Sequence, residues 1–443
     1  MQVIHLADFF LMPLYCVAVL VLVFLFRKKA NPDPSTYRIY YTSISLKILG
    51  GLASALVFQY YYGTGDSMIY FDEARLLHNH IVRDPSNIRY LFNNASSLQE
   101  LYDPSVNFVI SNFYNSNTVA TIRFVTFVTF LSANKYLTTT LLFSLFSFTG
   151  AWAIYRVFID RYPSQKKMLA IGMLYLPSLI FWCSSVSKDT ICFAALGWSF
   201  YCMHKIFTAG KHHLRYGIVL LLAMYITWLV KSYIVMAVLI SLLLAGVFYL
   251  FFNIRPLMKR IIVVSIFLGF LIYFFNTKNL ITDAMDKYTA GFIVDKIYEM
   301  QHNYETTDSG ANFDVGVIEP TVSGILSKVP GAISIVLFRP FLWESKNALA
   351  LLSGLENFLL LVFSAFVILR TGPINFFKVL HDDGLVLFCF MFSMVLASVI
   401  GLTTFNFGTI IRYKTAFIAF YTAFLILMNY RAGLLREKKR SVG

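Results

Sequence analysis

The sequence carries little charge. Only 14% of its 443 residues are Asp, Glu, Lys or Arg, whereas a soluble globular protein has about 25%. Hydrophobic residues make up 58% of the chain, so we do not expect a water-soluble enzyme of one or two domains. The 44 Phe and 27 Tyr residues also exclude a disordered chain, because such chains are poor in aromatic side chains. We therefore expect an integral membrane protein.

Several chemical signatures are absent. The five cysteines lie in or beside apolar runs and form no Cys-x-x-Cys pair, so neither a disulfide framework nor a cysteine metal site is expected. The chain has no GxxxxGK[ST] phosphate loop, no GxSxG elbow and no HExxH helix, which argues against nucleotide hydrolysis and serine hydrolysis. We expect no nucleotide cofactor.

Apolar runs bounded by charge, Pro or Gly predict about eleven transmembrane helices. They cover residues 8–26, 42–62, 137–158, 168–184, 190–207, 215–230, 234–252, 261–276, 350–369, 384–403 and 413–430. The basic clusters then fall on one side, as the positive-inside bias requires, which places the N-terminus outside and the C-terminus in the cytoplasm. The net charge of +14 is explained by this topology, so we expect no nucleic-acid partner.

The expected fold class is all-α, with residues 1–443 forming a single polytopic transmembrane domain. Two long outer segments, 63–135 and 277–347, interrupt the spans. Their apolar stretches are too polar for clean spans and are typical of amphipathic helices on the membrane surface. These stretches are residues 105–114, 118–132 and 280–304, and a polar loop at 303–316 follows. The expected location is the bacterial inner (cytoplasmic) membrane.

Three carboxylates, Asp66, Asp72 and Glu73, follow the second span. Such groups can act as a general base or hold a divalent cation, so the cofactor stays open. In a helix over residues 67–80, Asp66, Glu73 and His80 would share one stripe, each about 10 Å from the next. The three side chains would then be too far apart to bind one metal together. Alternatively, Asp66 caps this helix, Asp72 pairs with Arg75, and Glu73 faces water.

Two later segments carry basic and aromatic residues at predicted outer boundaries. Arg339, Trp343 and Glu344 precede the ninth span. They suit either anchoring at the lipid surface or binding of a phosphate or sugar ring. Arg412 and Lys414 enter the eleventh span from outside. Basic residues there oppose the positive-inside bias, so an anionic ligand or snorkelling to the headgroups must account for them.

Further charges lie in or near the spans. Lys188 and Lys231 lie in very short predicted outer turns, and we count both as candidate phosphate ligands; alternatively Lys188 pairs with its neighbour Asp189. Glu356 lies about two turns inside the ninth span, where a carboxylate is a functional candidate. Lys47 in the second span is close enough to the inner face to snorkel.

The layout resembles the GT-C class of membrane glycosyltransferases. The resemblance rests on acidic residues after an early span (Asp66, Asp72 and Glu73), a large outer loop with surface helices, ten or more spans, and basic residues on later outer segments. It covers the architecture of most of the chain. Two departures are that the acidic cluster follows the second span rather than the first, and that the C-terminal tail carries no soluble outer domain.

The resemblance implies a transferase that takes a sugar from a polyprenyl-phosphate carrier at the outer face. Asp66 or Asp72 would remove the proton from an acceptor hydroxyl, and Arg339, Arg412 and Lys414 would hold the lipid phosphate. The implied partners are membrane lipids, a polyprenyl-phosphate-linked saccharide and a glycan acceptor. The alternative is a transporter or flippase of an anionic lipid or solute, in which Glu356 and Lys231 matter more than Asp66.

Overall fold

The computed structural model describes most of the chain: residues 2–30, 33–92, 116–208, 212–253, 321–345 and 347–440, and the single residues 299 and 319. Within these ranges the regular elements are helices, and none is a β-strand. The all-α prediction is therefore confirmed for the described residues. Four predicted elements lie outside them: the surface helices 105–114 and 280–304, the loop 303–316 and the span 261–276.

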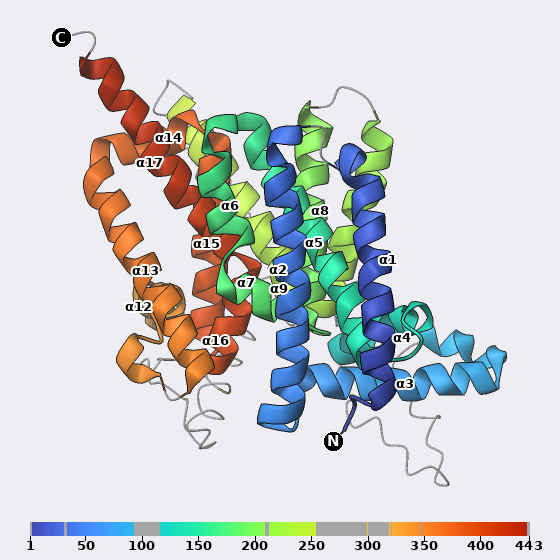
Figure 1. Cartoon of the computed structure of the whole chain (residues 1–443). Helices are drawn as coiled ribbons and strands as arrows, with labels where there is room; N and C mark the ends of the chain where they lie inside the picture. Colours follow the sequence, from blue (N-terminus) through green and yellow to red (C-terminus); the bar gives the residue numbers. More distant parts are fainter. Residues whose placement is uncertain are drawn as a thin grey trace. The chain divides into compact units, whose positions relative to one another are not determined.

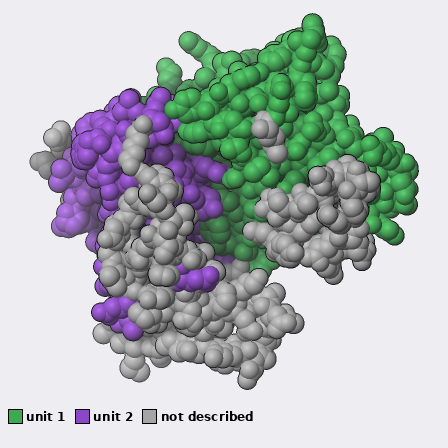
Figure 2. Space-filling view, turned by 90° about the horizontal axis from the view of Figure 1, so that it is seen from below, with its two compact units in different colours: residues 1–235 green, residues 236–443 purple. Residues whose placement is uncertain are grey.

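The helices pack into two compact units, Met1–Val235 and Met236–Gly443 (Figure 2). Unit 1 contains α1 (Leu6–Ala30), α2 (Tyr37–Val57), α3 (Asp66–Arg83), α4 (Ser116–Leu131), α5 (Tyr136–Arg161), α6 (Lys166–Leu174), α7 (Pro177–Trp182), α8 (Lys188–Thr208) and the first part of α9 (His213–Asn253). Helix α5 contacts α1, α2 and α8. Glycines bring α5 and α8 together, since a Cβ on Gly197 would lie 2.3 Å from the carbonyl oxygen of Gly150. Small residues of this kind allow close helix crossings in membrane proteins.

Unit 2 contains the second part of α9 and six further described α-helices. These six are α12 (Val322–Phe338), α13 (Ala348–Thr371), α14 (Pro373–Asp382), α15 (Gly384–Thr403), α16 (Phe407–Tyr413) and α17 (Ile418–Arg440). Helix α15 packs against α12 and α17. Its Gly401 makes the approach to α12 possible, because a Cβ there would lie 2.6 Å from the carbonyl oxygen of Ala332.

Seven helical stretches among the described residues are long and apolar enough to cross a membrane. They are Leu6–Lys28, Pro34–Tyr62, Tyr136–Arg161, His213–Phe252, Ala348–Thr371, Gly384–Thr403 and Ile418–Glu437. Together with the helical fold they fit a helical membrane bundle. Each overlaps one or two of the predicted spans, and the total of eleven stays a prediction.

Helix α9 contains a break at the place where two spans were expected to meet. The predicted spans 215–230 and 234–252 both fall inside α9, whose backbone leaves the helical region at Lys231 (φ −148°, ψ 79°). Such extended angles end one run of i to i+4 hydrogen bonds and start another. Lys231 therefore lies at the junction of two helical halves.

The predicted span 168–184 is not one continuous helix. Helix α6 ends at Leu174 and α7 begins at Pro177, with Leu176 in an extended conformation between them. Proline lacks an amide N–H and disfavours a helical conformation in the residue before it, which accounts for the break. The outer turn was expected over residues 183–189, and its residues 183–187 are buried within the structure.

Lys47 does not snorkel, contrary to the expectation. Its residue is only 2% exposed, and its ammonium donates hydrogen bonds to Ser147 Oγ (3.0 Å) and to the carbonyl oxygens of Leu179 (2.7 Å) and Cys183 (3.2 Å). These two carbonyls flank the end of the six-residue helix α7, where backbone acceptors need partners. The lysine therefore supports the broken segment from α2.

Candidate functional site

Helix α3 begins directly at the acidic cluster. After α2 and a short π-helix, Phe58–Tyr62, the chain turns through Gly63, whose φ of +70° suits glycine. Figure 1 shows α3 lying across the direction of α1 and α2 rather than along it. Gly65 occupies the N-cap position, so Asp66 lies inside the first helical turn and does not cap the helix. A carboxylate in that turn is favoured by the helix dipole.

The other two carboxylates of the cluster have different surroundings. Asp72 pairs with Arg75 at 2.5 Å, and both side chains are partly exposed, which confirms the local pair considered from the sequence. Glu73 is only 6% exposed and does not face water as the alternative expected. Asp72 is therefore engaged in a local ion pair, and Glu73 is enclosed by the protein.

Lys188 provides a cation near Asp66. It is the first residue of α8, and its ammonium donates a hydrogen bond to Thr118 Oγ1 on α4 (2.7 Å) and lies 5.5 Å from the centre of the Tyr70 ring on α3. Burial and the like charge of Lys231 lower the pKa of Lys188, while the charges of Asp66 and Asp189 act in the opposite direction. Four charged groups thus share one region of unit 1.

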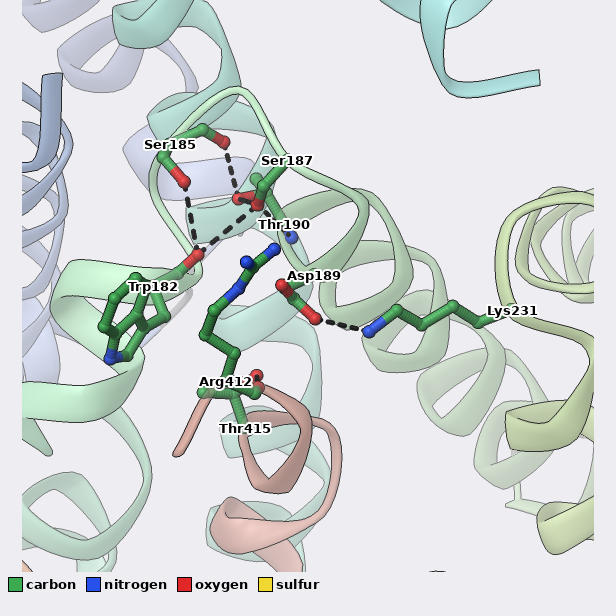
Figure 3. Close-up of polar contacts among 8 residues, drawn as sticks. All are labelled: Trp182, Ser185, Ser187, Asp189, Thr190, Lys231, Arg412 and Thr415. Atoms are coloured by element: carbon green, nitrogen blue, oxygen red, sulfur yellow. Dashed lines mark hydrogen bonds and ion pairs between the residues drawn. The ribbon is translucent and has the colours of Figure 1, made fainter. Parts of the chain in front are cut away.

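We call Asp66, Lys188, Asp189 and Lys231 the polar centre. Within it, Lys231 Nζ donates to Asp189 Oδ1 at 2.5 Å (Figure 3). The two side chains are only 7% and 3% exposed. The alternative in which Lys188 and Asp189 satisfy each other did not anticipate this pair, because Lys231 lies on another helix. The pair joins the start of α8 to the break in α9.

Hydroxyl groups satisfy the buried turn that precedes α8. Ser185 and Ser187 both donate to the carbonyl oxygen of Trp182 (3.4 Å each), and Thr190 Oγ1 donates to the carbonyl oxygen of Ser185 (2.6 Å). Figure 3 shows these bonds beside the Asp189–Lys231 pair. Buried non-helical backbone needs such partners, so the serines hold the turn that carries Lys188 and Asp189.

In unit 2, the loop of residues 339–344 is built around an ion pair. Arg339 Nε donates to both carboxylate oxygens of Glu344 (3.0 and 3.1 Å), and a second guanidinium nitrogen also contacts Oε1. The same carboxylate accepts the backbone N–H of Phe341 (2.7 Å). The guanidinium lies 4.9 Å from the ring centre of Phe407. Each charge of the pair is therefore balanced inside the loop.

The same loop presents a large aromatic surface, which we call the aromatic plate: the side chains of Phe341 and Trp343. Their rings stack with centres 4.9 Å apart and planes 23° apart. Trp343 is 78% exposed in this structure. The plate therefore stands beside the Arg339–Glu344 pair with its indole outward.

Lys414 and Arg412 have local partners in unit 2. Lys414 is 1% exposed, so its ammonium does not snorkel; it donates to the carbonyl oxygen of Leu337 (3.3 Å) and to Asn357 Oδ1. The backbone carbonyl of Arg412 accepts a hydrogen bond from Thr415 Oγ1 (2.5 Å; Figure 3).

The structure divides the candidate residues between the two units. Asp66, Lys188 and Lys231 meet in unit 1, and Arg339, Trp343 and Glu344 meet in unit 2. Asp189 was missed as a candidate, because its sequence signal, a charge beside another charge, points to a local pair. Among the described residues, no group of three or more His, Cys, Asp or Glu side chains could hold a metal ion.

The Arg339–Glu344 pair makes the stability of unit 2 depend on pH. Burial raises the pKa of Glu344, but its bonds from Arg339 and from the Phe341 N–H lower it more, to below the ordinary value of 4.5. A carboxyl whose pKa is depressed by folding stabilises the fold above its ordinary pKa, and this contribution disappears as the pH falls through the depressed value. Thermal unfolding between about pH 6 and about pH 3 should therefore show a smaller loss of stability for Glu344→Gln than for the parent. Equal losses in both proteins would contradict this assignment.

Comparisons with known proteins identify no relative of this chain. A scan against models of protein families, a search of curated proteins and a search of solved structures each found no match.

Proposed function

We propose that the protein is a membrane glycosyltransferase or polysaccharide polymerase that uses a polyprenyl-phosphate-linked sugar donor at the outer face of the bacterial cytoplasmic membrane. The observation that carries the proposal is the polar centre, where the ammonium of Lys188 on α8 lies 5.5 Å from the ring of Tyr70, one helical turn beyond Asp66 on α3, and where the charges of Lys188 and Asp66 act on each other. A transferase of this kind needs one group to accept a proton and one to balance the charge of a leaving phosphate.

The proposed reaction uses these two groups directly. The carboxylate of Asp66 takes the proton of an acceptor hydroxyl while that oxygen attacks the anomeric carbon of the donor sugar. The bond between this carbon and the phosphate oxygen breaks, and the electron pair leaves with the polyprenyl phosphate. Lys188 balances the negative charge that develops on the leaving oxygen.

The assignment of the phosphate to Lys188 is supported by the contacts of three other candidate cations. The guanidinium of Arg339 is neutralised by Glu344, the ammonium of Lys231 by Asp189, and that of Lys414 is buried among a carbonyl and an amide. Lys188 instead hydrogen-bonds a neutral hydroxyl. An anion that replaced the threonine hydroxyl would form a stronger, charge-assisted bond.

Native mass spectrometry of the gently solubilised protein tests this assignment. We expect the parent to retain polyprenyl phosphate or a lipid-linked sugar, and Lys188→Met to retain about 10-fold to 100-fold less, because hydrogen bonds to charged groups contribute about 1.5–3 kcal/mol. The matched control is Lys205→Met, which removes a lysine paired with Asp160 at the surface of unit 1. Equal lipid retention by both variants would remove Lys188 from the site.

One feature favours the alternative, a transporter or flippase of an anionic lipid or solute. Transporters place substrate and ion sites at interrupted helices, and α9 is interrupted at Lys231 beside the buried Asp189. This alternative predicts that transport depends on Lys231 and Glu356, and that Asp66→Asn leaves it intact. The transferase hypothesis predicts instead that Asp66→Asn removes activity.

A further inference from the structure

The loop of residues 339–344 is held in place by several bonds inside unit 2. Glu344 binds Arg339 and the Phe341 N–H. Asn357 Nδ2 on α13 donates to the carbonyl oxygen of Pro340 (3.3 Å), and Asn357 Oδ1 in turn accepts a bond from Lys414. Each of these groups would cost free energy if left unpaired when buried. The loop is therefore a fixed support for the side chains that it carries.

The aromatic plate is the most exposed part of this fixed loop. One face of the Trp343 indole is covered by the Phe341 ring, yet the residue is 78% exposed. The uncovered face is consequently available over most of its area. The stack with Phe341 limits the orientations of the indole, and a ring that is already ordered loses less conformational entropy when a ligand stacks on it.

The charges beside the plate identify the kind of ligand. Arg339 and Glu344 form a close ion pair in which each neutralises the other, so the surface favours neither a phosphate nor a cation. A neutral sugar ring fits better, because its C–H face is apolar and its hydroxyls can exchange hydrogen bonds with a guanidinium or a carboxylate. We propose that the aromatic plate binds a neutral pyranose ring of the glycan substrate.

This inference rests on the proposed function, because it assigns a subsite to a saccharide substrate. It also revises the role expected for Arg339 and Trp343, which becomes binding of a neutral sugar ring instead of a phosphate. The competing occupant is the lipid surface, since Trp is enriched at membrane boundaries. An anchor, however, gains nothing from the neutral ion pair of Arg339 and Glu344 that lies beside the plate.

The first experiment locates the indole in the full-length protein reconstituted in lipid nanodiscs. The chain has five Trp residues, so the emission of the parent minus that of Trp343→Phe isolates Trp343. We expect acrylamide in the water to quench this difference emission and phospholipids with brominated chains to leave it unchanged. Quenching by the brominated lipids would place the indole in the bilayer and overturn the inference.

The second experiment measures saccharide binding with an array of neutral oligosaccharides and the same nanodiscs. We expect the parent to bind at least one glycan, Trp343→Ala to weaken that binding about tenfold, and Trp343→Phe to retain most of it. Ile374→Ala removes an exposed apolar residue of unit 2 outside the plate and should change nothing. The inference fails if the parent binds no glycan, or if Trp343→Ala binds as well as the parent.

These readouts separate failure of the subsite from failure of the proposed function. If Asp66→Asn abolishes sugar transfer while Trp343→Ala leaves the KM for the glycan unchanged, the transferase stands and the plate is not its subsite. If Asp66→Asn transfers sugar normally, the proposed function fails whatever the array shows.

Discussion

Asp189→Asn should destabilise unit 1 by about 3–5 kcal/mol, because removing one member of a buried ion pair leaves an uncompensated charge. The partner is the ammonium of Lys231, 2.5 Å away, and both side chains are more than nine-tenths buried. An amide oxygen can still accept a hydrogen bond, but it does not balance the positive charge. Lys231 also lies at the break in α9, so the loss weakens the link between α8 and α9.

Thermal unfolding in detergent, followed by the reactivity of the buried thiols, measures this loss. Cys183 and Cys192 lie in and near the turn before α8 and are buried, so they become reactive when this region opens. Asp160→Asn is the matched control, because it breaks the partly exposed pair with Lys205. Exposed pairs contribute about 0–1 kcal/mol, so this control should change little.

A second variant distinguishes a charge effect from a packing effect. Asp189→Asn combined with Lys231→Met removes both charges, and replacing a whole buried pair by neutral groups is often nearly neutral. The double variant should therefore recover most of the stability that Asp189→Asn loses. Additive losses in the double variant, or a single loss as small as that of the control, would show that the pair does not support the fold.

The parts of the structure that could be predicted depend on local patterns. Runs of apolar residues mark the long helices, and the charged Lys231 between two apolar runs marks the break in α9. The Asp72–Arg75 pair follows from helix geometry, since residues three apart face the same side. None of these inferences requires knowledge of which helices are neighbours.

The polar centre could not be predicted in the same way, because its contacts join distant parts of the chain. Asp189 and Lys231 are 42 residues apart, and Lys188 and Thr118 are 70 residues apart. Sequence spacing assigned Asp189 to its neighbour Lys188 instead. Lys47 was expected at the inner face for a similar reason: a long basic side chain near a span end usually snorkels. Its carbonyl partners, 132 and 136 residues away, become visible only when α2 packs against α7.

Asp66→Asn should reduce sugar transfer by about 10²–10⁴-fold, the usual contribution of a general base. The amide is nearly isosteric with the carboxylate, but it cannot take the proton of the acceptor hydroxyl. Asp66 lies in the first turn of α3 without capping it, so the change should leave the fold intact. Transfer can be followed by mass spectrometry of lipid-linked and acceptor glycans in membranes from cells that carry only the variant.

The variant Asp72→Asn distinguishes a specific role of Asp66 from a general need for acidic residues in this segment. Asp72 lies six residues along the same helix, but it pairs with Arg75 at a partly exposed site, so its amide variant should transfer sugar at nearly the parental rate. If both variants lose activity equally, the segment as a whole is needed and Asp66 is not the base. Asp66→Asn could also be inactive and still retain the lipid-linked donor in native mass spectrometry. The defect would then lie in the chemical step. In that variant Lys188 still balances the phosphate charge, but the proton acceptor is missing.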